Sequence, residues 1–421
     1  MRRDVRWLWL GGAVLLWACG GDLPPPSGGE EKITLRVPIY PYIPDAAGDE
    51  FKALKDRIEA EFEAAHPDVD LVINPSCFQD DFYEPAGIAN SLSGGSDCAY
   101  DVIETDTAIL GELVASGAVR PWPRMPEGIS FHPAGLTAST ATPPAAQVPY
   151  GVPHWLCNHF IVSRSESVRQ ARTTPALVQA LAALGTPEPD TAGDMLGSWN
   201  LPSLYLDGWA DRHGGAELRS AVTTENYDSA VLQSMRSFVR TCEADGQNPC
   251  IDGTYNQYEN FDLPAQLFAQ GKVDSTLGYS ERLHTIIKNL PANATISALR
   301  ISSAPLGGQG SNPILFTDSY FLSARCTGDC EKAALAFTEY MSQPSTFEWI
   351  LMSEDAPAAG RVPRYLLPAT LDAYEAPKVS ADPIYPVLAS ETRNGVPFPN
   401  GGLLNIRRQM ETDIKAVLSS P

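Results

Sequence analysis

The stretch of sequence that decides the fold is Pro149-Tyr-Gly-Val-Pro-His-Trp-Leu-Cys-Asn158. Prolines and a glycine interrupt its first half, and the apolar run Phe160-Ile-Val162 follows shortly after. A cluster of breakers between two strand-forming segments is typical of a chain that leaves one structural unit for the next. We therefore predict two lobes, with the chain crossing between them at about Cys157.

Outward from this crossing, strand and helix patterns alternate. The β-branched runs at residues 33–39, 69–73 and 101–104 predict strands. Residues 49–65 and 107–116 have helical patterns, the first with its apolar side chains spaced along one face at Phe51, Leu54, Ile58 and Phe62. Strands that alternate with helices predict an α/β protein with a largely parallel, covered sheet.

The chain has 421 residues, enough for two or three domains. Lys and Arg total 30 against 51 Asp and Glu, a formal net charge of -21. A field of this sign repels phosphate backbones, so nucleic acid is excluded as a partner, and a small cationic or polar ligand fits better. We expect a monomer.

The N-terminus has the features of an export signal. Arg2, Arg3 and Arg6 precede a short apolar run at residues 7–18, which is too short to span a bilayer. Its end, Leu16-Trp-Ala-Cys19, resembles a bacterial lipobox; the alternative is an ordinary signal with an incidental cysteine. We predict an exported protein, periplasmic, at the cell surface or secreted, that touches the membrane only through a lipid on Cys19.

We predict a signal peptide and a tether before the two lobes. The proposed boundaries are 1–18 for the signal peptide, 19–32 for the lipidated cysteine and tether, 33–157 plus about 298–345 for lobe 1, and 158–297 plus about 346–421 for lobe 2.

Seven cysteines remain after Cys19, and an oxidising compartment favours disulfides among them. Six fall into local couples, which predicts the pairs Cys77 with Cys98, Cys242 with Cys250, and Cys326 with Cys330. Cys157 is left over. An odd thiol in an exported protein is buried and inert, linked to another molecule, or a nucleophile.

Ligands of open α/β sheets bind at the carboxyl ends of strands. This rule selects Tyr40, Tyr42, Asp106, Tyr279, Glu281 and Asp318 as candidate site residues. Each has an ordinary alternative: the tyrosines as core aromatics, Asp106 as a helix N-cap, and Glu281 as a partner of Arg282 or of solvent. Because no phosphate-binding glycine loop and no zinc-ligand spacing is present, we predict no cofactor and no metal.

Several blocks resemble the bacterial thiaminase I (thiamine pyridinylase) family, in matching order from residue 33 to about 385. They are Ile33-Thr-Leu-Arg-Val-Pro-Ile-Tyr-Pro-Tyr-Ile-Pro-Asp45, residues 149–158, Phe268-Ala-Gln-Gly271, Gly278-Tyr-Ser-Glu281, Leu315-Phe-Thr-Asp318 and Tyr365-Leu-Leu-Pro-Ala369. The resemblance implies a two-lobed fold like that of periplasmic (type II) substrate-binding proteins, with the site in the cleft between the lobes.

The resemblance also implies roles. Cys157 would be the nucleophile and Glu281 the general base of a transferase that replaces the thiazole of thiamine by an amine, pyridine or thiol. Asp106, Asp318, Tyr40, Tyr42 and Tyr279 would bind thiamine. Two family tyrosines are missing, one at Phe316 and one near Phe261-Asp262.

Two other functions share the export signal and the fold. A lipoprotein receptor that delivers thiamine, a related pyrimidine or a sugar to an importer would need no nucleophile. An unrelated cysteine hydrolase would carry a histidine hydrogen-bonded to Cys157 in place of Glu281.

Overall fold

The computed structural model describes residues 32–38, 40, 42–74, 85–94, 99–141, 148–185, 189–308 and 312–420. The predicted signal peptide, Cys19, the tether up to residue 31, and the predicted Cys77–Cys98 pair lie outside these residues. Within them, no helix is both long and apolar enough to cross a membrane.

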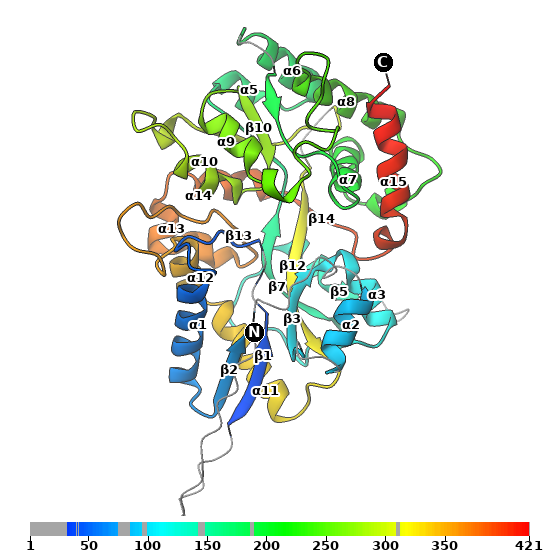
Figure 1. Ribbon diagram of the computed structural model, residues 1–421. Helices are drawn as coiled ribbons and strands as arrows, with labels where there is room; N and C mark the ends of the chain where they lie inside the picture. The colour runs from blue at the N-terminus through cyan, green and yellow to red at the C-terminus, as the bar shows by residue number, and fades with distance from the viewer. Residues whose placement is uncertain are drawn as a thin grey trace, which may run out of the picture.

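The first lobe is built on a central mixed sheet (Figure 1). Its strand order is β13-β7-β12-β14, and β3 and β4 also pair with β12. A separate parallel pair joins β1 to β2. The strands are β1 (Ile33–Val37), β2 (Val69–Ile73), β3 (Val102–Asp106), β4 (Val119–Arg120), β7 (Gly151–Cys157), β12 (Ile314–Ser323), β13 (Leu367–Pro368) and β14 (Val396–Pro397).

Helices cover this lobe, and its short β5–β6 hairpin lies beside them. They are α1 (Lys52–Ala65), α2 (Pro85–Ser93), α3 (Leu110–Ala115), α4 (Pro133–Ala138), α11 (Asp329–Met341), α12 (Pro344–Leu351) and α13 (Pro377–Ala381), with β5 (Thr140–Ala141) and β6 (Val148–Pro149). Helix α1 buries Leu54, Ile58 and Phe62, which confirms the predicted face. The helix begins after Phe51, the last residue of the preceding turn, which has a left-handed backbone conformation with a φ of 64°.

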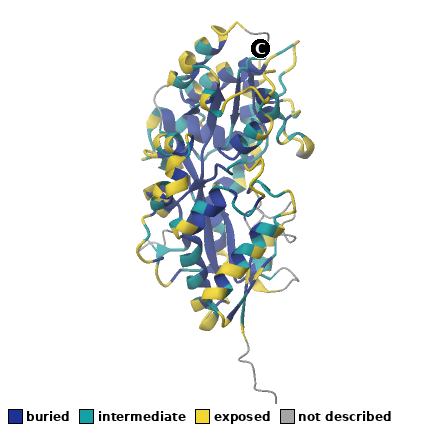
Figure 2. Ribbon diagram, turned by 90° about the vertical axis from the view of Figure 1, so that its left-hand side faces the viewer, coloured by how far each residue is buried: buried dark blue, intermediate teal, exposed yellow. Residues whose placement is uncertain are grey.

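The second lobe contains a four-stranded sheet in the order β11-β8-β10-β9, packed among helices (Figure 1). Its strands are β8 (Phe160–Ser163), β9 (Thr191–Ala192), β10 (Ser275–Gly278) and β11 (Arg300–Ser303). Its helices are α5 (Glu166–Gln170), α6 (Thr174–Ala182), α7 (Asn200–His213), α8 (Ser229–Val239), α9 (Leu263–Ala269), α10 (Arg282–Lys288), α14 (Tyr385–Thr392) and α15 (Leu403–Leu418). Buried residues run the length of the molecule through both lobes (Figure 2).

The predicted largely parallel sheet is wrong. Strand β12 runs antiparallel to β3, β4 and β7, and β8 runs antiparallel to β10 and β11. The reason is that β12 returns to the first lobe after the chain has passed through the second. Local alternation of strands and helices cannot reveal the direction of a strand that arrives from so far along the sequence.

The chain passes from the first sheet to the second between β7 and β8, at the predicted crossing. The sheet to which a strand belongs differs from the proposed lobe boundaries for three later strands. Strand β11 still pairs with β8, past the proposed return at about 298, and β13 and β14 pair within the first sheet although both were expected in lobe 2. These differences arise because short strands carry little sequence pattern.

Two of the predicted disulfides are present, Cys242–Cys250 and Cys326–Cys330. Each closes a short local loop, with sequence separations of 8 and 4 residues. Cys157 is buried and is the only free cysteine in the described part of the chain.

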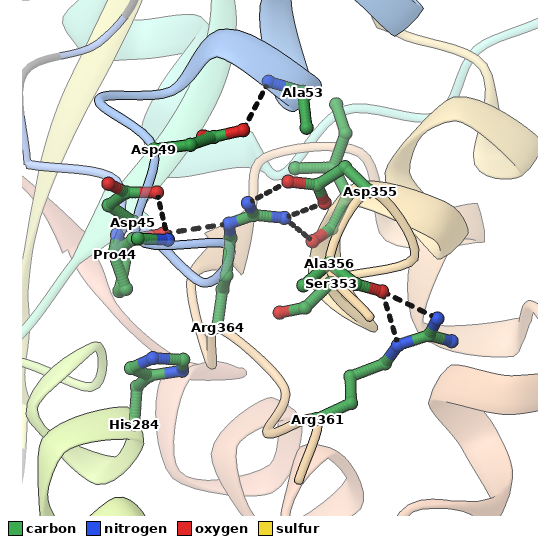
Figure 3. Close-up of polar contacts among 12 residues, drawn as sticks. Pro44, Asp45, Asp49, Ala53, His284, Ser353, Asp355, Ala356, Arg361 and Arg364 are labelled. Carbon is green, nitrogen blue, oxygen red and sulfur yellow. Dashed lines mark hydrogen bonds and ion pairs between the residues drawn. The ribbon is translucent and has the colours of Figure 1, made fainter. Parts of the chain in front are cut away.

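A buried arginine holds the loop between β1 and α1, which carries Tyr40 and Tyr42 (Figure 3). The Arg364 guanidinium donates two 2.6 Å hydrogen bonds to Asp355 and one of 3.0 Å to the carbonyl of Pro44. Next to it, His284 of α10 donates from Nδ1 to the carbonyl of Pro363 at 3.0 Å. One short segment thus joins the tyrosine loop of the first lobe to a helix of the second.

Asp355→Asn should lower the free energy of unfolding by about 3–5 kcal/mol, because it leaves the Arg364 charge buried without its counter-charge. Urea denaturation of both proteins measures the difference. Glu127→Gln is the control, because its ion pair with Arg124 is exposed and should contribute little. Equal stability of Asp355→Asn and wild type would contradict the assigned role of the pair.

Candidate functional site

The register of β12 places four side chains on one face of the central sheet. Phe316 pairs with Cys157 of β7, and Asp318 pairs with Asp106 of β3. Residues two apart on a strand share a face, and directly paired residues share it too. The thiol, the phenyl ring and the two carboxyl groups therefore project from the same side.

The two predicted tyrosines of the first lobe follow the end of β1. Tyr40 is buried, and its hydroxyl lies 3.7 Å from Cys157 Sγ. Tyr42 is 42% exposed and meets Tyr40 edge-on at 5.6 Å between ring centroids. Its ring also lies 6.4 Å from that of Phe261, which comes from the second lobe.

The second lobe contributes the predicted Tyr279 and Glu281 from the turn between β10 and α10. The turn directly follows the carboxyl end of β10, as the sequence predicted. Glu281 is buried, and its side chain does not cap α10. Tyr279 stacks on His159 at 4.9 Å between ring centroids.

All seven predicted catalytic and substrate-binding residues line one cavity of about 250 Å³. The cavity draws its wall from both sheets and from the loops between them. Besides the predicted residues, its lining includes Ala108, His159, Asp194, Trp199, Asn200, Ser203, Phe261, Pro264, Ala265, Thr276, Leu277, Gly278, Arg282, Phe316 and Phe398.

The Cys157 thiol is surrounded by groups that oppose its ionisation. It donates to Asp318 Oδ2 at a distance of 3.9 Å. Burial, followed by the negative charges of Asp318 and Glu281, raises the pKa of the Cys157 thiol well above its ordinary value. A thiolate would therefore form here only if a neighbouring base takes the proton or a bound cation offsets the negative charges.

Burial also raises the pKa values of the cavity carboxyl groups. It raises that of Asp106 to about 7, against the stabilising hydrogen bond from the Ala108 amide. For Asp318, burial followed by the charge of Asp106 raises the pKa well above the ordinary range. Burial raises the pKa of Glu281 as well. Of the three, Asp106 would exchange its proton near neutral pH, and the upward shifts of the other two favour proton transfer of the kind that acid–base chemistry uses.

Two buried polar atoms belonging to residues of the cavity wall have no hydrogen-bond partner among the described residues. They are Oδ1 of Asp318 and Nε2 of His159. Buried polar atoms in native proteins are nearly always hydrogen-bonded, and an orphan is costly. A ligand with polar groups would satisfy such atoms when it fills the cavity.

The ordinary alternatives for the site residues are partly true. Asp106 does cap the following 3-10 helix, since Oδ1 accepts from the Ala108 amide at 2.7 Å, yet it also lines the cavity. Tyr40 is a core aromatic and a cavity residue at once. Arg282 forms its ion pair with Asp262 at 2.8 Å and lies 3.4 Å above the Phe261 ring, while its charge still opposes the rise in the pKa of Glu281.

Sequence reasoning missed several lining residues. Asp194 follows β9, but a two-residue strand has too little pattern to be predicted. Trp199, Asn200 and Ser203 come from the start of α7, within the least interpretable part of the sequence. Phe261 and Phe398 lie in loops, where no periodic signal exists.

The two positions where the resemblance to thiaminase I would place a tyrosine are both in or beside the cavity. Phe316 packs against His159, Tyr279 and Phe398 with centroid distances of 5.2, 6.0 and 4.6 Å. At the other position, Phe261 reaches Tyr42 across the cleft while Asp262 pairs with Arg282. Within the described residues, no group of three or more His, Cys, Asp or Glu side chains is placed to hold a metal ion.

Stability should fall as pH rises from about 4 to about 7, in part because of Asp106. Its folded pKa of about 7 exceeds the ordinary 3.8, so the folded state keeps a proton that the unfolded chain releases over this range. Asp106→Asn removes this cost. The free energy of unfolding of Asp106→Asn relative to wild type, from urea titrations, should therefore increase across the interval. Asp68→Asn, at an exposed position, is the control. If the difference in unfolding free energy between Asp106→Asn and wild type does not vary with pH, the raised pKa assigned to Asp106 is wrong.

Comparison with known proteins identifies the fold. No protein-family model matches the chain. Thiaminase-1 of Paenibacillus thiaminolyticus is 23% identical over 379 residues, 86% of this chain and 82% of the relative. Thiaminase I of Clostridium botulinum, solved in complex with thiamin, aligns over 91% of this chain and 98% of its own with a TM-score of 0.69 and 17% identity. The maltose-binding protein MalE of Listeria monocytogenes aligns over 93% of each chain with a TM-score of 0.60 and 15% identity. The chain therefore has the two-lobed α/β fold common to thiaminase I and periplasmic maltose-binding proteins.

Proposed function

We propose that this protein is a thiamine-degrading transferase that replaces the thiazole of thiamine by another nucleophile. The observation that carries the proposal is a buried free thiol, Cys157, in a cleft lined by carboxyl groups and tyrosines. The similarity to thiaminases along most of the chain supports it.

The cavity has the charge that a cationic substrate needs. Asp106, Asp194, Glu281 and Asp318 line it, whereas the lining arginine, Arg282, is already paired with Asp262. A thiazolium cation bound here would offset the carboxylate charges and meet aromatic faces such as Tyr42 and Tyr279. Its aminopyrimidine could donate to the unpartnered Asp318 Oδ1.

The proposed reaction is a covalent displacement in two halves. Glu281 takes the proton of Cys157, and the thiolate adds to C6 of the pyrimidine. The electron density gained by the ring expels the neutral thiazole. A second nucleophile then adds at the exocyclic methylene, and loss of the Cys157 thiolate restores the ring.

Two carboxyl groups compete for the role of base. Asp318 touches the thiol at 3.9 Å, whereas Glu281 acts on it from across the cleft. We assign the base to Glu281, because the resemblance to thiaminase I implies that role for it, and because burial and the charge of Asp106 raise the pKa of Asp318 and so favour the protonated form of that group. The raised pKa of Glu281 makes it a stronger base than an exposed carboxylate.

A solute receptor is the second candidate, because maltose-binding proteins share the fold. Such a protein would bind thiamine, a related pyrimidine or a sugar and leave it whole. The histidine–cysteine hydrolase is not supported: His154 and His159 use Nδ1 to bind Glu104 and Asp207, and the thiol neighbours are Tyr40 and Asp318. We further propose export with lipid attachment at Cys19, as either function would allow.

The test is turnover of thiamine by residues 20–421 with pyridine as nucleophile, followed by mass spectrometry of the free thiazole alcohol and the pyrimidine–pyridine adduct. Cys157→Ser should abolish turnover, since the weaker hydroxyl nucleophile cannot replace the thiolate. Glu281→Gln should lower kcat by about 10²- to 10⁴-fold, the usual contribution of a general base.

Asp318→Asn separates the two candidate bases. If it lowers kcat as much as Glu281→Gln and abolishes the pH dependence of Cys157 alkylation, the base is Asp318. Calorimetric titration of thiamine into Cys157→Ser checks that binding survives. If the wild-type protein binds thiamine but leaves it intact when several nucleophiles are offered, the proposal of a transferase is wrong and the solute receptor is favoured.

A further inference from the structure

The cavity wall contains a buried histidine that the two half-reactions above leave without a role. His159 follows Cys157 by two residues, at the crossing between β7 and β8. Its ring lies between Tyr279, stacked at 4.9 Å, and the edge of Phe316 at 5.2 Å. It is 2% exposed and belongs to the cavity lining.

An aspartate fixes the orientation and the tautomer of this ring. Asp207 of α7 lies with Oδ2 2.9 Å from His159 Nδ1, while its Oδ1 accepts from the Ile314 amide at 3.0 Å. A carboxylate only accepts, so the neutral imidazole carries its proton on Nδ1 and a lone pair on Nε2. That Nε2 is the atom without a partner among the described residues.

A second aspartate, Asp211, lies one turn along α7 from Asp207. Asp211 accepts from the amides of Asn312 and Gly307 at 3.0 and 3.3 Å. Burial, and then the charge of Asp207, raises the pKa of Asp211 to about 8. The protonated form of Asp211 is thus favoured, which limits the negative charge buried behind the imidazole.

The proposed transfer leaves one proton without an acceptor. Glu281 takes the Cys157 proton in the first half and must return it when Sγ leaves in the second. A thiol or an amine brings a further proton on its S–H or N–H, whereas pyridine brings none. A second base in the cavity would accept this proton as the new bond forms, before a cationic product has to build up.

We propose that His159, oriented by Asp207, is the general base that accepts the proton of a protic nucleophile. This inference rests on the proposed thiamine transfer. The sulfur or nitrogen lone pair forms a bond to the methylene carbon as the proton passes to Nε2. The electrons of the exocyclic double bond return to the ring and break the C6–Sγ bond, and Sγ recovers the proton from Glu281. The imidazolium later releases its proton to water, so the step is balanced and redox-neutral.

His159→Asn tests this role, because the amide keeps a donor for Asp207 but has nothing at the place of Nε2. Steady-state turnover of thiamine is measured at neutral pH with pyridine and, in parallel, with 2-mercaptoethanol. The ratio of kcat with the thiol to kcat with pyridine should fall by about 10²-fold or more relative to wild type, the contribution expected of a general base.

Two further variants keep the test decisive. In Asp207→Asn the side-chain oxygen can still accept from the Ile314 amide, but the amide nitrogen donates to His159 Nδ1. The histidine proton then moves to Nε2, so this variant should show the same selective loss of turnover with the thiol. His284→Asn is the matched control, a buried histidine outside the cavity that should not alter the ratio of the two rates. It also corrects for any reduction of disulfides by the thiol.

The possible outcomes separate the two proposals. Equal losses with pyridine and with the thiol would show that His159 only supports Tyr279, and retention of both rates would show that it takes no proton. Either result overturns the inference while leaving the transferase intact. Absence of turnover by wild type with pyridine would instead overturn the proposed function itself.

Discussion

The antiparallel pairing of β12 with both β3 and β7 is the constraint on which the rest of the site depends. It sets Phe316 against Cys157 and Asp318 against Asp106, so that thiol and carboxyl groups share one face of the sheet. The first residue of the strand, Ile314, donates its amide to Asp207 and thereby also fixes the partner of His159. A one-residue slip of β12 would turn Asp318 to the opposite face and separate it from the thiol.

The same pairing concentrates negative charge where little positive charge is available. Asp106, Asp318 and Glu281 face one cavity, and the resulting raised pKa values are an energetic cost of the folded state. The buried charge of Arg364 is compensated in full by comparison. Its guanidinium donates two hydrogen bonds to Asp355 and further ones to backbone carbonyls. Asp106 has a hydrogen bond from the Ala108 amide but no such ion pair with any described residue, an arrangement that suits a site for a cation.

Much of this arrangement could be predicted from sequence, because it depends on local pattern. The carboxyl ends of β1, β3 and β10 identified Tyr40, Tyr42, Asp106, Tyr279 and Glu281, and the breaker cluster located the crossing at Cys157. The direction of β12 could not be predicted, since its partners lie more than 150 residues earlier in the chain. The His159–Asp207 contact could not be predicted either. The local sequence around a histidine that follows a strand does not indicate which residue of a helix 48 residues away it will contact.

The division of the site between the lobes explains how a fold used by binding proteins could support covalent chemistry. Cys157, Asp106 and Asp318 belong to the first sheet, whereas Tyr279 and Glu281 follow a strand of the second. In the proposed reaction the thiol and its base stand on separate lobes, so a cation bound between carboxylates of both lobes would hold them in place for the proton transfer. His159 follows β7 at the crossing itself, two residues from the thiol, while its partner Asp207 lies on α7 of the second lobe. In the proposed reaction both bases therefore depend on the second lobe, Glu281 through its position and His159 through Asp207.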